Sequence, residues 1–115
     1  HQASCASVAS ILTALYFDVL RPGDRVAVKP HASPIYHAAM HLLGREPIEQ
    51  LQRFRGLGGA QSYPSRTKDR CGVDFSTGSV GLGPAAPLFA GVVRRYVDAY
   101  RWRRLTGSAV FVRAA

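Results

Sequence analysis

The segment that most constrains this chain is the glycine-dense stretch Asp74–Pro84. Glycine has no Cβ, so such a turn reaches unusual backbone angles and lets a ligand approach the main chain closely. Pro84 suits the first turn of a helix, where its missing N–H costs nothing. The stretch therefore predicts a ligand-facing turn that leads directly into a helix.

The hydrophobic pattern around this turn alternates between helical and strand-like segments. Helices are predicted where apolar residues recur at i, i+3, i+4 and i+7, and strands where β-branched residues cluster between turns. The expected helices are residues 8–19, 33–43 and 46–54 and a helix from Pro84 to about Tyr100; the expected strands are Arg25–Lys29 and Ser108–Val112.

A long loop, residues 56–83, separates these helices from the one that begins at Pro84. It is longer than an idle connection, and long ordered loops in compact domains tend to be functional. The order of elements predicts an α/β fold in which parallel strands are flanked by helices. At 115 residues, the chain is expected to form a single domain, residues 1–115. Because it begins at His1, we expect it to be part of a larger domain.

Composition narrows the class of protein. The net charge is +8, and arginines crowd the last quarter of the chain. They are interpreted as a solvated helix face, with a polyanion-binding surface as the alternative, because no nucleic-acid motif accompanies them.

We see no apolar run near the length of a membrane span, so a cytoplasmic protein is expected. Cys5 and Cys71 are expected to be free thiols, although Arg70 beside Cys71 also suits a reactive thiol.

Histidines stand at two of the predicted helix starts. His1 lies one turn before Ser4, and His31 follows a strand candidate and precedes a helix. Imidazole transfers protons near neutral pH, and helix N-termini favour anions. From the residues alone this is an α/β ligand site with histidines. His37 and His41 share a helix face, but without a metalloprotease glutamate between them a packing or surface role is favoured.

Four motifs occur in a fixed order: His1–Ser4, His31–Pro34, Gln61–Pro64 and Thr77–Gly83. Together they resemble the transketolase-like thiamine diphosphate enzymes, and look most like the homodimeric bacterial pyruvate dehydrogenase E1 component. The Ser-Tyr-Pro element around Tyr63 is the feature that favours the E1 branch. The resemblance implies the first part of a thiamine diphosphate-binding domain.

The resemblance also implies roles for individual residues. The implied catalytic residues are His1, His31 and Tyr63. The implied cofactor-binding residues are Ser4, Gly78, Ser79, Val80 and Gly81. The family holds Mg²⁺ through an aspartate and an asparagine that follow the strand corresponding to Ser108–Val112, and neither is in this chain. The isolated chain is therefore expected to bind the cofactor poorly and to be inactive.

The implied reaction is decarboxylation of a 2-oxo acid such as pyruvate, with two-carbon transfer to the lipoyl domain of an E2 partner. A homodimer is expected for the full-length parent. The alternatives are a transketolase-type ketol transfer from a ketose, and an inactive fragment that acts as a basic interaction module.

Overall fold

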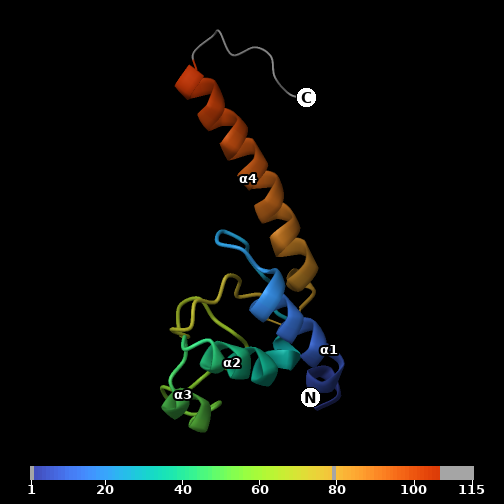
Figure 1. The fold of residues 1–115 in the computed structure, drawn as a ribbon, viewed down its shortest axis with the longest axis vertical. Coiled ribbons are helices and arrows are strands. Elements are labelled where there is room, and N and C mark those ends of the chain that lie inside the picture. Colours follow the sequence, from blue (N-terminus) through green and yellow to red (C-terminus); the bar gives the residue numbers. More distant parts are fainter. Residues whose placement is uncertain (1, 79, 107–115) are drawn as a thin grey trace.

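The structure is a computed structural model that describes residues 2–78 and 80–106, with side chains through Arg101. Its elements are all helical (Figure 1). In chain order they are α1 (Gln2–Ala14), the π-helical turn η1 (Leu15–Val19), the 3-10 turn η2 (Pro30–Ala32), α2 (Ser33–Leu42), α3 (Ile48–Gln52) and α4 (Leu82–Thr106).

The expected α/β fold with parallel strands is wrong for the described residues, which contain no strand. The segment Arg25–Lys29 is a connection without regular structure. A strand needs a neighbouring backbone to pair with, and here the N–H of Val26 donates instead to the carboxylate of Asp74, at 2.9 Å. The second strand candidate, Ser108–Val112, lies outside the described residues.

The predicted helices are present, with shifted boundaries. Among the described residues, the first helix begins at Gln2 and continues through η1, and α2 matches its prediction to within one residue. Pro34 lies in the first turn of α2, where a proline leaves no intrahelical bond unmade. The third helix, α3, is shorter than the expected range of residues 46–54 and covers only Ile48–Gln52.

A small core forms between η1, α2, the segment that precedes α2 and the long loop. Its centre is Tyr36 and Met40 of α2, both almost fully buried, packed with Val28, Cys71 and Val73. Tyr16 of η1 approaches Tyr36 edge-on, with the ring centroids 5.9 Å apart. The packing explains why the loop stays close to α2.

The helical run Gln2–Val19 differs from the expectation that no apolar run approaches the length of a membrane span. It is 18 residues long with a mean hydropathy of 1.2, so by length and composition it is long enough to cross a membrane, and only 6% of it is buried. Both a membrane span and an N-terminal signal sequence meet these criteria. The same run packs against α2 and η2, and Leu12 is its buried residue.

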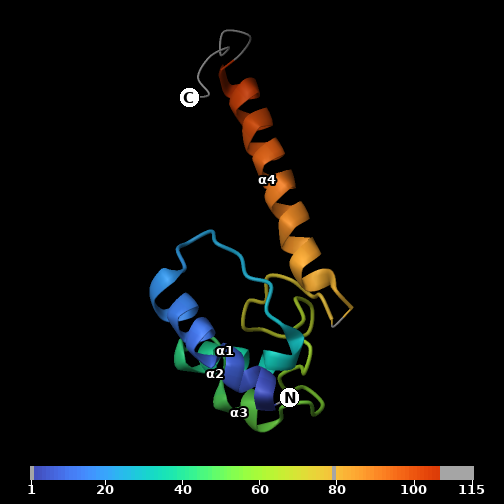
Figure 2. The ribbon, with the colours of Figure 1, turned by 90° about the vertical axis from the view of Figure 1, so that its right-hand side faces the viewer.

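Helix α4 projects away from the rest of the molecule (Figures 1 and 2). The radius of gyration is 17.6 Å, compared with about 13 Å for a compact chain of this length. The apolar side predicted for this helix is exposed to solvent. Its exposed residues are Leu88, Val92, Val93, Tyr96, Val97 and Tyr100.

The long loop is ordered by side chains that bind its backbone. The buried carboxylate of Asp69 accepts hydrogen bonds from the N–H groups of Gln61, at 2.9 Å, and Ser65, at 2.7 Å. The hydroxyl of Ser76 accepts another from the N–H of Arg66, at 2.8 Å. These bonds fix the course of the loop without regular secondary structure.

We predict that Asp69→Ala destabilises the chain by about 2–4 kcal/mol, because two backbone N–H groups lose a charged acceptor in a buried position. Urea denaturation followed by far-UV circular dichroism measures the change. The matched control is Asp98→Ala, which removes an exposed carboxylate 3.8 Å from Arg94 and should cost no more than about 0.5 kcal/mol. Equal losses in the two variants would contradict the role given to Asp69.

Candidate functional site

A pocket of about 510 Å³ lies between the segment before α2 and the turn before α4. One side consists of Ala27 and Lys29–His31. The other consists of Gly78, Gly81, Gly83 and Pro84, and we call the described residues of the segment 78–83 the glycine turn. The volume lies within the usual range of small-molecule sites.

His31 is placed in this pocket by the short turn η2. Pro30 fixes the backbone at the start of the turn, and the N–H of Ala32 donates to the carbonyl of Lys29, at 3.0 Å. The thiol of Cys5 lies 3.8 Å from the carbonyl oxygen of His31. The first turns of α1 therefore lie against the backbone that carries His31.

The glycine turn has a backbone that only glycine adopts easily. Gly78 and Gly81 have φ values of 58° and 83°, in the left-handed region where side chains are strained. A Cβ built at Gly78, Gly81 or Gly83 meets no atom within 4 Å, so the space above the turn is open. An open, glycine-lined wall suits a flat ring that lies close to the backbone.

Tyr63 lies next to this pocket, with its ring centroid 6.5 Å from that of His31. Its side chain is 48% exposed. The loop that carries Tyr63 is bound to α2, because Nε2 of His37 lies 2.9 Å from the carbonyl oxygen of Gln61. His31 and Tyr63, which are 32 positions apart in the sequence, are thus neighbours in space.

The other predicted site residues are placed less tightly. Ser4 is half-buried on the first turn of α1, and Val80 is 77% exposed. His1 and Ser79 lie outside the described residues. Their implied roles, like those of His31, Tyr63, Gly78 and Gly81, stay predictions.

Sequence reasoning missed Lys29, which lines the pocket. Its signal was present, because a cation stands two positions before His31 in the segment Lys29-Pro30-His31. The described residues lining this pocket include no carboxylate.

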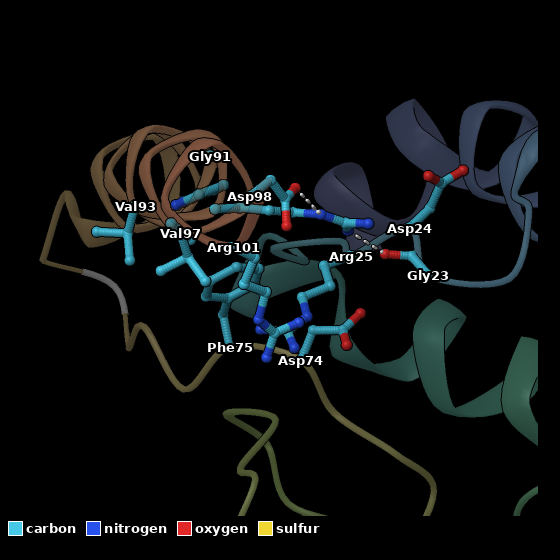
Figure 3. A pocket seen from close by; sticks show the side chains of 13 residues that line it. Gly23, Asp24, Arg25, Asp74, Phe75, Gly91, Val93, Val97, Asp98 and Arg101 are labelled. Atoms are coloured by element: carbon cyan, nitrogen blue, oxygen red, sulfur yellow. Dashed lines mark hydrogen bonds and ion pairs between the residues drawn. The ribbon is translucent and has the colours of Figure 1, made fainter. Parts of the chain in front are cut away.

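A second pocket, of about 900 Å³, separates α4 from the compact part of the chain. Figure 3 shows that its lining mixes both signs of charge, with Arg25 and Arg101 near Asp74 and Asp98. Arg94 spans it by donating to the carbonyl oxygen of Gly23, at 2.9 Å. A polyanion site is expected to carry a single sign of charge, and the lining of this pocket carries both.

Cys71 is not poised to react. It is buried, at 2% exposure, and burial raises the pKa of its thiol to about 11. The hydrogen bond with Tyr36 acts in the opposite direction, and the negative charges of Glu46 and Asp69 add to the rise. A reactive thiol needs a lowered pKa and access to solvent, and Cys71 in this structure has neither.

Comparison with known proteins identifies the relatives of this chain. It is 32% identical over 98 residues to 6-deoxy-6-sulfo-D-fructose transketolase subunit SqwG of Clostridium sp. (strain MSTE9), covering 76% of this chain and 36% of that protein. It is 36% identical over 80 residues to the pyruvate dehydrogenase E1 component of Mycobacterium tuberculosis, covering 65% and 9%. It is 32% identical over 114 residues to transketolase-like protein 2 of Mus musculus, covering 90% and 18%.

The chain belongs to the transketolase-like thiamine diphosphate-binding family. It spans about a third or less of the length of these relatives. No protein-family profile and no solved structure matches it. The relatives include both transketolases and pyruvate dehydrogenase E1 components, so they support the transketolase-like family without separating its two reactions.

We predict a pH dependence of stability from Cys71. Its pKa is raised by folding, from 9.0 to about 11. The neutral thiol therefore contributes stability that is fully present below about pH 9 and is lost as the pH rises through about 11. Urea midpoints measured between pH 7.5 and 11 in metal-free buffer should fall less steeply for Cys71→Ala than for the unmodified chain.

The control for this measurement is Cys5→Ala, which changes a half-buried thiol outside the core. It should leave the alkaline slope unchanged. Tyr16, whose pKa is raised to about 12 mainly by burial, contributes to the slope in all three proteins. Identical slopes for the Cys71 variant and the unmodified chain would show that the Cys71 thiol is not the group responsible.

Proposed function

We propose that this chain forms the cofactor-facing part of a thiamine diphosphate-dependent enzyme, and that the pocket between His31 and the glycine turn receives the thiamine portion. The observation that carries the proposal is this shared pocket. Its walls come from two family motifs that lie almost 50 residues apart in the sequence.

We further propose the reaction of the E1 branch: decarboxylation of a 2-oxo acid and transfer of the two-carbon unit to a lipoyl group. In such enzymes the chemistry of carbon–carbon cleavage comes from the thiazolium ring of the cofactor. The protein binds the substrate, orients it, and moves protons at its oxygen atoms.

His31 is suited to the proton step. Its imidazole lines the pocket, and imidazole is the side chain that most readily exchanges protons near neutral pH. Tyr63 presents a phenol beside it, which is a hydrogen-bond donor for a developing oxyanion. Lys29 adds a positive charge to the same wall, which attracts either a substrate carboxylate or a diphosphate.

The position of Tyr63 is the reason to place the E1 reaction ahead of ketol transfer. In the resemblance that the sequence carries, the Ser-Tyr-Pro element belongs to the E1 branch, and its tyrosine lies beside His31.

Assays of a complete enzyme that contains this segment distinguish the two reactions. Two-carbon transfer from pyruvate to a lipoyl domain supports the E1 assignment, and transfer from a ketose phosphate to an aldose supports transketolase chemistry. The homodimer and the lipoyl-domain partner belong to the same proposal.

In that complete enzyme, we predict that His31→Ala lowers kcat by about 10²- to 10⁴-fold, the usual contribution of a positioned acid–base group. The matched control is His41→Ala. His41 is half-buried on α2, and its Nδ1 bonds the carbonyl oxygen of Glu46 rather than the pocket. An unchanged kcat in His31→Ala would remove His31 from the reaction.

The chain alone tests the cofactor pocket. In a titration with thiamine diphosphate followed by two-dimensional ¹H–¹⁵N NMR, we expect weak binding, with shifts in the amides of the glycine turn and of Lys29 and His31. Gly78→Ala should weaken these shifts, because Gly78 has a φ of 58° and a left-handed alanine costs about 1 kcal/mol.

The control is Gly44→Ala, at a glycine with a φ of 71° that is equally open and lies outside the pocket. It carries the same backbone strain and should leave the shifts unchanged. Shifts confined to the arginines of α4, or equal weakening in both variants, would contradict the pocket. Micromolar affinity would contradict the expectation that the isolated chain binds poorly.

A further inference from the structure

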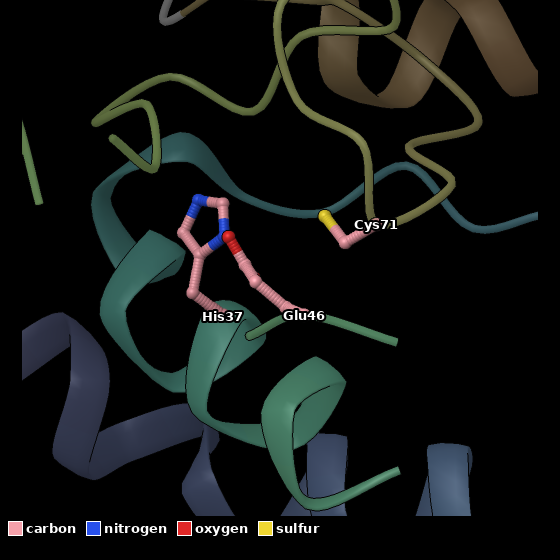
Figure 4. A group of neighbouring side chains, drawn as sticks. All are labelled: His37, Glu46 and Cys71. Atoms are coloured by element: carbon pink, nitrogen blue, oxygen red, sulfur yellow. The ribbon is translucent and has the colours of Figure 1, made fainter. Parts of the chain in front are cut away.

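Below the long loop, three side chains that can bind a metal meet in the core. His37 of α2, Glu46 of the turn after α2, and Cys71 of the long loop are all buried (Figure 4). One ligand atom from each, a ring nitrogen, a carboxylate oxygen and the sulfur, lies within 4.8 Å of the other two. None of the three belongs to the pocket that contains His31.

The hydrogen bonds of His37 fix where its protons lie. Nε2 faces the carbonyl oxygen of Gln61 at 2.9 Å, and a carbonyl only accepts, so Nε2 carries a proton. Nδ1 faces Oε2 of Glu46 at 2.8 Å. Without a cation, a second proton must lie between these two atoms. With a cation, the same imidazole would present a bare Nδ1, and its N–H···O=C bond is the usual support of a metal-bound histidine.

Glu46 has an unused oxygen. Its side chain is 0% exposed, and Oε1 has no hydrogen-bond partner. Leaving a buried carboxylate oxygen unsatisfied is costly. Neighbouring Cys71 offers only its sulfur, which donates to the hydroxyl of Tyr36 at 3.7 Å. A divalent cation among these groups would satisfy Oε1 and neutralise the carboxylate.

We propose that His37 Nδ1, Glu46 and Cys71 Sγ form a binding site for a zinc-like divalent cation. The mixed nitrogen, oxygen and sulfur donor set suits Zn²⁺ or Co²⁺ and not Mg²⁺ or Ca²⁺, which prefer oxygen ligands. Three protein ligands leave the fourth tetrahedral position for water or another ligand. In a tetrahedral zinc site the ligand atoms lie about 3.3–3.6 Å apart, so the 2.8 Å contact between His37 and Glu46 would widen slightly and the sulfur would move inward.

Binding in this site must release protons. The thiol of Cys71 gives up one and becomes the thiolate that binds the metal. The His37–Glu46 pair gives up the proton between Nδ1 and Oε2. The cation therefore replaces about two protons, and the net charge of the three side chains and the ion together ends at zero.

The cation would also connect three parts of the chain: α2, the turn at Glu46, and the loop segment at Cys71. Gln61, which His37 holds through its carbonyl oxygen, lies two positions before Tyr63. An occupied site would thus fix the base of the loop that carries Tyr63.

Cobalt titration of the full chain tests the proposal, after removal of metals with a chelator. We expect a thiolate-to-cobalt charge-transfer band in the near ultraviolet that saturates at one Co²⁺ per chain, and its loss when Zn²⁺ is added. Calorimetry in buffers of different ionisation enthalpy should give about two protons released per ion. Absence of the band in the folded, unmodified chain would overturn the proposal without use of any variant.

Two matched pairs of variants assign the ligands. Cys71→Ala should abolish the band while Cys5→Ala retains it; the reverse result would place the thiolate ligand at Cys5. Glu46→Gln should weaken cobalt binding at least about 10-fold, whereas Glu49→Gln, at an exposed glutamate of α3, should not. Equal affinity in the two glutamate variants would remove Glu46 from the site and overturn the proposal.

Discussion

The two hydrogen bonds made by the imidazole of His37 support the arrangement around it. One ring nitrogen meets Glu46 at 2.8 Å and the other meets the carbonyl oxygen of Gln61 at 2.9 Å. The ring is also enclosed by aromatic neighbours, with the centroid of Tyr36 at 5.2 Å and that of Phe54 at 5.9 Å. A single buried side chain thereby joins α2, the turn that follows it and the long loop. Polar groups that are buried and satisfied in this way specify one packing, because any other leaves them without partners.

The helices of this chain could be predicted from local patterns, whereas the predicted sheet is wrong for the described residues. α2 follows its apolar spacing and its early Pro34, which act within the helix itself. A strand depends on a neighbour elsewhere in the chain. Arg25–Lys29 has the composition of a strand, yet Val26 is bonded by a carboxylate, Asp74. The composition of a segment indicates that it could form a strand. Whether it does so depends on whether another backbone segment lies beside it in the fold.

The two walls of the candidate pocket could each be predicted from the sequence, because His31 and the glycine turn each lie in a recognisable motif. Their meeting around one cavity depends on how the long loop folds back. The cluster of His37, Glu46 and Cys71 was not predicted. Its members do not stand at a recognisable ligand spacing in the sequence. The i, i+4 relation of His37 and His41 was interpreted as a packing or surface role, and His41 bonds the backbone of Glu46.

The exposure of α4 has a consequence for local unfolding of the chain. Its apolar residues, such as Leu88 and Tyr96, are in water in the folded chain, so unfolding the helix exposes little further apolar surface. Its own backbone bonds, a weak exposed pair of Arg94 with Asp98, and the bond from Arg94 to the carbonyl oxygen of Gly23 supply most of what maintains it. Fraying of this helix is therefore independent of the core around Tyr36, and its amide protons should exchange with solvent long before those of α2.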